Sequence, residues 1–212
     1  MSTSATSPAR ERGDLFGARF ELFADVLSIG LATAVASLPL ITLPAALSTA
    51  CTLLRRRRLY AEPCTAGRYF GLLRTRMARR GEWAAGALVF VFGAVLAADA
   101  GLAAAGLPGA VPFALALAAV ATGACVAGLR TCALYGHVRA EPGRGGRHEG
   151  WRHAARAGAA RTVRDLPGTA LVVLALGTAV VCAWALPPVA FLVPGPLAAA
   201  LTAVELRWEH GR

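Results

Sequence analysis

The chain has 212 residues, of which 56% are hydrophobic and only 16% are charged, and its mean hydropathy is +0.54. Soluble domains carry roughly 25% charged residues, so this chain has too little polar surface to cover a globule in water. The net charge of +10 suits nucleic acid, but no aromatic residues alternate with the basic ones as a single-strand binder requires.

The chain begins with a polar stretch, residues 1–14, which predicts a disordered tail. The uncharged run that follows, Val26 to Leu54, is too long for one straight span, since a single helix of this length would measure about 43 Å. Pro39 and Pro44 each remove a backbone donor and interrupt it. Two interpretations stay open: one broken span with the N-terminus outside, or a hairpin that turns at 39–43.

Three more uncharged runs follow, Trp83 to Ala98, Ala100 to Leu129 and Leu166 to Val204. Asp99 separates the first two, and with the glycines and proline of 99–109 it marks the turn of one predicted hairpin. The last run is about twice the length of roughly 20 residues that one span needs. Pro187 and Pro188 near its middle predict the turn of another hairpin.

The arginines are distributed unevenly, and lysine is absent. Most of them lie in two stretches, 55–80 and 130–164, while the long uncharged runs have none. This is the positive-inside pattern of a polytopic membrane protein, whose basic loops stay in the cytoplasm. We therefore expect a protein of the bacterial cytoplasmic membrane, with the turns at 99–109 and 186–190 outside and the C-terminus inside.

The sequence thus predicts an all-α, polytopic membrane helix bundle in one domain, residues 15–207, with five or six transmembrane segments arranged as hairpins. Two basic cytoplasmic loops, 55–82 and 130–165, separate them. The expected segments are 15–38, 44–58, 83–104, 110–134, 166–186 and 189–206, and five result if 15–58 is a single broken span.

Around the first break, the stretch SLPLITLPAALSTA resembles the YesL-like family of bacterial membrane proteins, with Ser37, Leu38, Pro39 and Thr42 matching an S-L-P-x-x-T motif. The small-residue helix that follows in the family is similar to 44–50, and its basic segment with an aromatic residue is similar to 68–74. The stretch 155–169, which ends LPGT, is similar to the segment before the family's last two helices. The resemblance implies a small polytopic membrane protein, without an established activity, that occurs alongside carbohydrate-uptake and polysaccharide-degradation systems.

Two polar residues are candidates for binding. Asp99 is the one charged residue between Glu82 and Arg130, and a carboxylate near a membrane segment is a candidate for contact with a cation, a proton or a hydroxyl-rich solute. The alternative is that it lies in water just past the outer end of a helix. Thr42 either donates to backbone carbonyls that the break frees or contacts a solute at discontinuous helix ends.

The basic segments 69–80 and 151–164 predict helices that carry arginine beside apolar residues, and such helices lie on anionic lipid or dock a cytoplasmic partner. The residues expected to face lipid headgroups or a partner are Arg55, Arg56, Arg57, Arg58, Arg152 and Arg156. Glycines at 86, 93, 123 and 128 predict helix faces that approach one another closely.

Nothing in the sequence indicates an enzyme, a cofactor or a metal site. The five cysteines form no CxxC pair, and the histidines of HEGWRH have the wrong spacing for one helix face. We expect a non-enzymatic accessory component linked to carbohydrate uptake or utilisation. Its expected partners are the lipid bilayer, anionic lipid headgroups and a sugar-transport complex, and not nucleic acid. The alternatives are a small-solute transporter or channel subunit and a lipid-binding scaffold.

Overall fold

The computed structural model describes residues 14–60, 62, 64–105, 109–140, 151–186 and 190–210, and these residues form helices and no strand. This confirms the all-α prediction. The helices in chain order are α1 (Asp14–Ala36), the short 3₁₀ helix η1 (Leu40–Thr42), α2 (Leu43–Tyr60), α3 (Ala66–Met77), α4 (Arg80–Ala104), α5 (Ala110–Ala140), α6 (Trp151–Arg164), α7 (Leu166–Ala185) and α8 (Pro194–His210).

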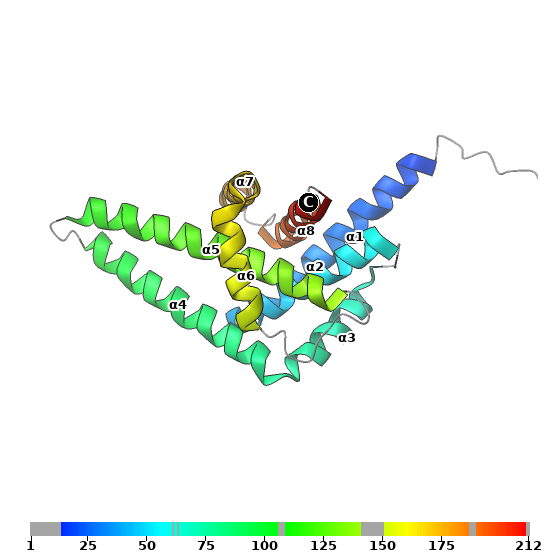
Figure 1. Cartoon of the computed structure of the whole chain (residues 1–212), viewed down its shortest axis with the longest axis horizontal. Helices are drawn as coiled ribbons and strands as arrows, with labels where there is room; N and C mark the ends of the chain where they lie inside the picture. Colours follow the sequence, from blue (N-terminus) through cyan, green and yellow to red (C-terminus); the bar gives the residue numbers. More distant parts are fainter. Residues whose placement is uncertain are drawn as a thin grey trace, which may run out of the picture.

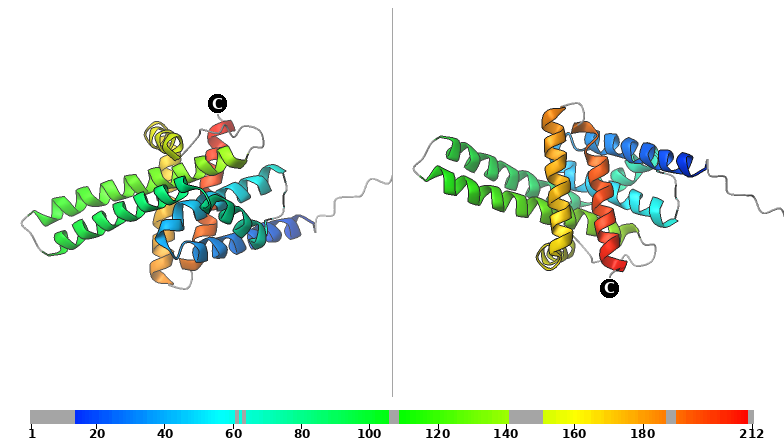
Figure 2. Two further views of the ribbon diagram at one scale, coloured as in Figure 1. Left: turned by 90° about the horizontal axis from the view of Figure 1, so that it is seen from below. Right: turned by 90° about the horizontal axis from the view of Figure 1, so that it is seen from above.

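The chain folds back on itself between α1 and α2, so the region 15–58 has the geometry of the hairpin alternative (Figure 2). Pro39 caps η1 with an extended backbone, and Pro44 lies in the first turn of α2, where a missing N–H costs nothing. The open end of the hairpin is joined by the Arg57 guanidinium, whose Nε lies 3.1 Å from the Asp25 carboxylate.

Helix α2 is the central helix of the molecule. Its residues from Pro44 to Arg55 are all buried, and it packs against α1, α3, α4, α5 and α8. Several of its buried side chains are polar, among them Ser48, Thr49 and Thr52. Residues 44–55 of the expected membrane segment 44–58 are therefore surrounded by protein instead of facing outward.

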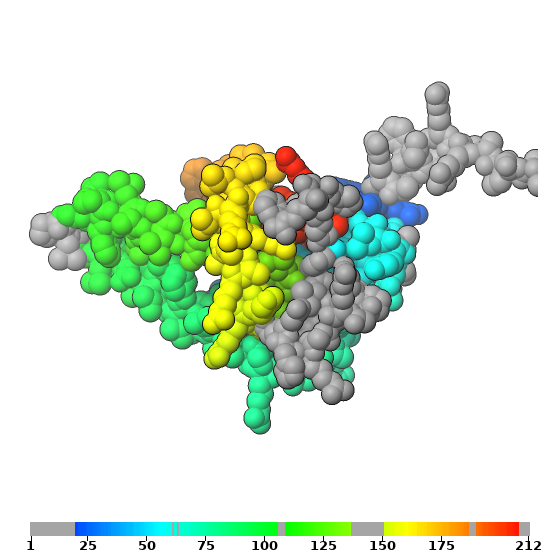
Figure 3. Space-filling view, in the orientation of Figure 1, coloured from blue at the N-terminus to red at the C-terminus, as the bar shows by residue number. Residues whose placement is uncertain are grey.

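The long helices α4 and α5 form a hairpin that projects away from the other helices (Figures 1 and 3). Most of its large apolar side chains are exposed: none of the residues in the most apolar part of α4 is buried, and in that of α5 only 6% are. Gly109, at φ 90°, takes the left-handed conformation that a turn into α5 requires.

Three helices of the described chain are long and apolar enough to cross a membrane: α4, α5 over Ala110–Gly136, and α7. The prediction of five or six spans is therefore not confirmed. The physical reason is that α1 carries Glu21 and Asp25, α2 ends in four arginines, and α8 is short, with 17 residues.

Helices α7 and α8 lie across the α4–α5 hairpin instead of beside it: Figure 1 shows α7 end-on, and Figure 2 shows both helices lengthwise. Helix α8 crosses α1 at a glycine pair, where a Cβ on Gly30 would lie 2.8 Å from the Gly195 nitrogen. The three apolar helices α4, α5 and α7 are therefore not all parallel to one another.

Candidate functional site

A buried carboxylate lies at the base of the α4–α5 hairpin. Glu82, only 2% exposed in the first turn of α4, accepts a hydrogen bond from the Tyr135 hydroxyl at 3.0 Å and another from Trp151 Nε1 at 3.0 Å. The rings of Tyr135 and Trp151 are stacked with centroids 4.2 Å apart. Three helices, α4, α5 and α6, are therefore joined through one carboxylate.

A buried guanidinium completes this group, which we call the Glu82 cluster (Glu82, Tyr135, Trp151, Arg76, Ser48 and Thr52). Arg76 of α3 donates to Ser48 Oγ and to Thr52 Oγ1, each at 2.7 Å, and its charge lies 5.7 Å from the centroid of the Tyr135 ring. Thr52 in turn donates to the Gly136 carbonyl at 3.0 Å. The cluster thus also joins α2 and α3 to α5.

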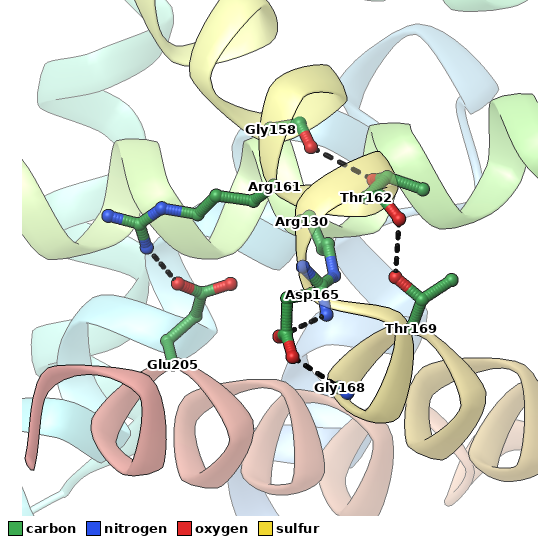
Figure 4. A network of polar contacts seen from close by, with 8 residues as sticks. All are labelled: Arg130, Gly158, Arg161, Thr162, Asp165, Gly168, Thr169 and Glu205. Atoms are coloured by element: carbon green, nitrogen blue, oxygen red, sulfur yellow. Dashed lines mark hydrogen bonds and ion pairs between the residues drawn. The ribbon is translucent and has the colours of Figure 1, made fainter. Parts of the chain in front are cut away.

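A second buried group, the Arg130 junction (Arg130, Arg161, Asp165, Gly168 and Glu205), connects α5, α6, α7 and α8 (Figure 4). Arg130 is 1% exposed, and its Nη2 lies 2.9 Å from Asp165 Oδ2. The other oxygen of Asp165 accepts from the Gly168 backbone N–H at 3.0 Å and so caps α7. Arg161 of α6 pairs with Glu205 of α8, which is 4% exposed.

Close packing holds the same junction. A Cβ on Gly168 would lie 1.9 Å from Asp165 Oδ2, and one on Gly158 would lie 2.6 Å from Thr131 Oγ1. Figure 4 also shows the Thr169 hydroxyl donating to the Thr162 carbonyl, at 2.8 Å. A side chain at 168 would therefore displace the Asp165 carboxylate, and one at 158 would displace the Thr131 side chain.

Both groups act chemically as internal connections. Their carboxylates are occupied by donors from the same chain, and removing one partner of a buried ion pair leaves an uncompensated charge at a cost of about 3–5 kcal/mol.

A cavity between α1, α2 and α8, lined by Val26, Leu54, Arg57 and Ala199 among others, has a volume of about 10 Å³, room for at most one water molecule.

Asp99 lies inside α4, which continues to Ala104, and not in a loop past the helix end. The alanines around it extend the helix because alanine has the highest helix propensity. Asp99 is half-buried, and its carboxylate makes no hydrogen bond or ion pair with any residue that the structure describes. Solute binding by Asp99 stays a prediction.

Thr42 lies at the end of η1, and its hydroxyl is within hydrogen-bonding distance of the carbonyls of Ala36 and, at 2.6 Å, Pro39. It therefore serves the backbone at the break between α1 and α2, which was one of the two alternatives. Solute contact by Thr42 stays a prediction. Pro187 and Pro188, expected at the turn of the last hairpin, lie outside the described residues.

The arginines expected on the surface differ in exposure. Arg55 is 5% exposed and belongs to the core, because α2 is covered on all sides up to that residue. Arg56 and Arg57 are half-buried, and Arg58 is exposed. Arg152 and Arg156 are exposed one turn apart on α6, which begins and ends at the residues that the sequence predicted.

The described residues contain no group of three or more histidine, cysteine or acidic side chains that could hold a metal ion. Burial raises the pKa of the Cys64 thiol to about 11, so at neutral pH it is a protonated, weakly nucleophilic thiol. The sulfur donates instead to the Leu53 carbonyl at 3.4 Å.

The sequence-based search missed Glu82, Arg76, Arg130, Asp165 and Glu205 because charges beside apolar runs were interpreted as topology signals. One local signal was present: Asp165 followed by Leu-Pro-Gly is typical of a helix N-cap with proline in the first turn. The partners of the others lie far away in the sequence and have no local signature.

Comparison with known proteins gives no match to this chain among family models, curated proteins or solved structures.

Proposed function

We propose that this chain is a non-enzymatic accessory protein of the bacterial cytoplasmic membrane that serves carbohydrate uptake or utilisation. Its contact with lipid is supported by three apolar helices, α4, α5 and α7, most of whose large apolar side chains are exposed. The link to carbohydrate is supported by the resemblance of Ser37, Leu38, Pro39 and Thr42 to the YesL-like motif.

The observation that carries an accessory role is the contrast between the core and the α4–α5 hairpin. In the core, buried polar side chains bind one another and hold helices together. On the hairpin, a Cβ on Gly93, Gly123 or Gly128 would meet nothing within 4 Å. These glycines leave room for a helix of another protein to approach closely, and such contact is what an accessory component needs.

A photoreactive residue in place of Phe92, which is 41% exposed on α4, tests this proposal in native membranes. We expect cross-links to a membrane component of a sugar-transport complex, identified by mass spectrometry. The same residue in place of Arg156 on α6 is the control for contacts made from the cytoplasmic side. Purification from native membranes with no transport component attached contradicts the proposal.

The orientation that we propose places α3, α6 and the C-terminus in the cytoplasm. Exposed Arg152 and Arg156 support contact of α6 with anionic lipid, since each arginine near such a surface contributes about 1 kcal/mol. Liposomes with and without phosphatidylglycerol distinguish this contact from a purely apolar one. Neutralising both arginines should abolish the preference for anionic lipid, and an unchanged preference argues against it.

One observation favours the second candidate function, a small-solute transporter or channel subunit. Asp99 is a carboxylate on the hairpin whose oxygens have no protein partner among the described residues, and polar groups at membrane depth mark solute and proton paths. Reconstituted protein should then move a solute, and Asp99→Asn should stop it. Vesicles that take up neither sugars, cations nor protons above the protein-free rate exclude this function.

A further inference from the structure

The α4–α5 hairpin has a free part and an embedded part. Beyond Gly86, no residue of α4 is buried, and no residue of α5 is buried before Val126. The free part, residues 87–104 and 110–125, projects beyond the other helices, whereas α7 and α8 cross the hairpin away from its tip (Figures 1 and 2). Its exposed large apolar side chains are Leu88, Val89, Phe90, Val91, Phe92, Val95, Leu102, Val111, Phe113, Leu115 and Val120.

The length of the free part fits the hydrocarbon of one bilayer. Residues 87–104 span about 27 Å and residues 110–125 about 24 Å at 1.5 Å per residue, against a hydrocarbon thickness of about 30 Å. Exposed Arg79, Arg80 and Trp83 lie just before it. Arginine and tryptophan are the residues that anchor a helix at the membrane interface.

The embedded part has the opposite character. The buried polar and charged side chains that the structure describes all lie outside residues 83–129, in the α1–α2 hairpin, the start of α4, the end of α5 and the helices packed on them. A buried set that includes Arg76, Glu82, Arg130 and Asp165 is typical of a core beside the membrane, because charge is expensive at membrane depth.

The turn of the α1–α2 hairpin fixes the boundary between the two parts. A Cβ on Gly86 would lie 1.8 Å from the Ile41 carbonyl oxygen, so η1 is seated on α4 at Gly86, one turn after the interfacial Trp83. If α4 enters the hydrocarbon after Gly86, the turn at 37–42 is level with the near headgroups. It therefore does not reach the far side.

We infer that the free part of the α4–α5 hairpin binds the hydrocarbon of the bilayer, while the α1–α2 hairpin remains on the same side as α6 with its turn at the membrane boundary. Neither 15–38 nor 44–58 then crosses the membrane. Leu38 and Leu40, 70% and 57% exposed at the turn, then lie at the level of the near headgroups, where water reaches them.

The same boundary gives Asp99 a depth. It lies 13 positions beyond Gly86, about 20 Å along α4, and so within the hydrocarbon on its far side. The half-buried positions near it are Leu96, Asp99 and Ala103, which recur with helical spacing on one face. That face is the one that α5 half covers, so Asp99 points toward the neighbouring helix and not directly into lipid.

Single cysteines at three exposed positions, Leu40→Cys, Ala105→Cys and Arg156→Cys, test the inference with a membrane-impermeant maleimide on intact cells and after permeabilisation. The parent chain is the control: its Cys51, Cys64 and Cys132 are buried, but its Cys125 and Cys182 are exposed on apolar helices, so labelling of each variant is measured relative to the parent. Equal thermal stability of each variant and the parent in detergent shows that the fold is retained.

We expect Ala105→Cys to react in intact cells, and Leu40→Cys and Arg156→Cys to react only after permeabilisation. Reaction of both Leu40→Cys and Ala105→Cys in intact cells overturns the inference, because the α1–α2 turn would then reach the far side. Failure of Leu40→Cys to react under either condition also overturns it. The inverse pattern, with Leu40→Cys and Arg156→Cys alone reacting in intact cells, keeps the inference and overturns the proposed orientation.

Discussion

Replacing Asp165 by alanine removes two interactions at the junction of α5, α6, α7 and α8. Arg130, 1% exposed, loses the carboxylate that lies 2.9 Å from its Nη2, and breaking such a buried pair costs about 3–5 kcal/mol. Helix α7 loses its N-cap acceptor for the Gly168 N–H, which costs about 1 kcal/mol. The expected loss is about 4–6 kcal/mol, or about 8–24 °C in the unfolding midpoint for a chain of this length.

Thermal unfolding of the detergent-solubilised protein, followed by tryptophan fluorescence, measures this loss. Asp99→Ala is the matched control, because the same side chain is removed from a helix where it has no partner among the described residues. It should change stability by no more than about 0.5 kcal/mol. Adding Arg130→Met to Asp165→Ala should recover part of the loss, because the unpaired charge is gone. Equal stability of the two alanine variants, or strictly additive losses in the double variant, refutes the reasoning.

Three further predictions concern the core. Glu82→Ala leaves the Tyr135 hydroxyl and a tryptophan N–H without their acceptor, and it should cost about 2–4 kcal/mol in the same unfolding assay; a loss below 1 kcal/mol contradicts the described cluster. Gly86→Ala places a Cβ 1.8 Å from the Ile41 carbonyl oxygen and should destabilise the protein by about 1–3 kcal/mol. In Gly93→Ala the added Cβ meets nothing within 4 Å, so this control should be neutral or stabilising. Equal effects of the two substitutions refute the contact of η1 with α4. Burial raises the pKa of the Cys64 thiol to about 11, so its thiolate should appear in the folded state only as the pH approaches 11. Mass spectrometry should therefore show Cys64 unalkylated by iodoacetamide at pH 7.5 until the protein is unfolded. Rapid modification of the folded protein at pH 7.5 contradicts its burial.

The sequence predicted the helices well because their signals are local. The break at Pro39 and Pro44, the helix 151–164 and the hairpin around 105–109 all follow from proline, glycine and charge positions. Helix α4 ends at Ala104, where the predicted segment 83–104 ends. Asp99 therefore lies inside the helix and not in the turn, because the alanines after it favour helix more strongly than one glycine opposes it.

The role of each helix was harder to predict, because it depends on contacts between distant residues. Helix α2 is apolar enough to suggest a membrane segment, yet it forms the core because α1, α3, α5 and α8 surround it. Arg130 and Asp165 lie 35 residues apart in the chain, and neither side chain reveals its partner in the sequence. The sequence alone does not distinguish an arginine that sets membrane topology from one that pairs with a buried carboxylate.

The membrane residence of the α4–α5 hairpin is measured most directly by electron paramagnetic resonance of a nitroxide in place of Phe92, with Arg156 as the comparison site, in liposomes. Oxygen concentrates in hydrocarbon, whereas a charged nickel chelate stays in water. We predict strong relaxation by oxygen and almost none by the nickel chelate at position 92, and the reverse at position 156. Relaxation by the nickel chelate at position 92 equal to that at position 156 would show that the hairpin lies in water.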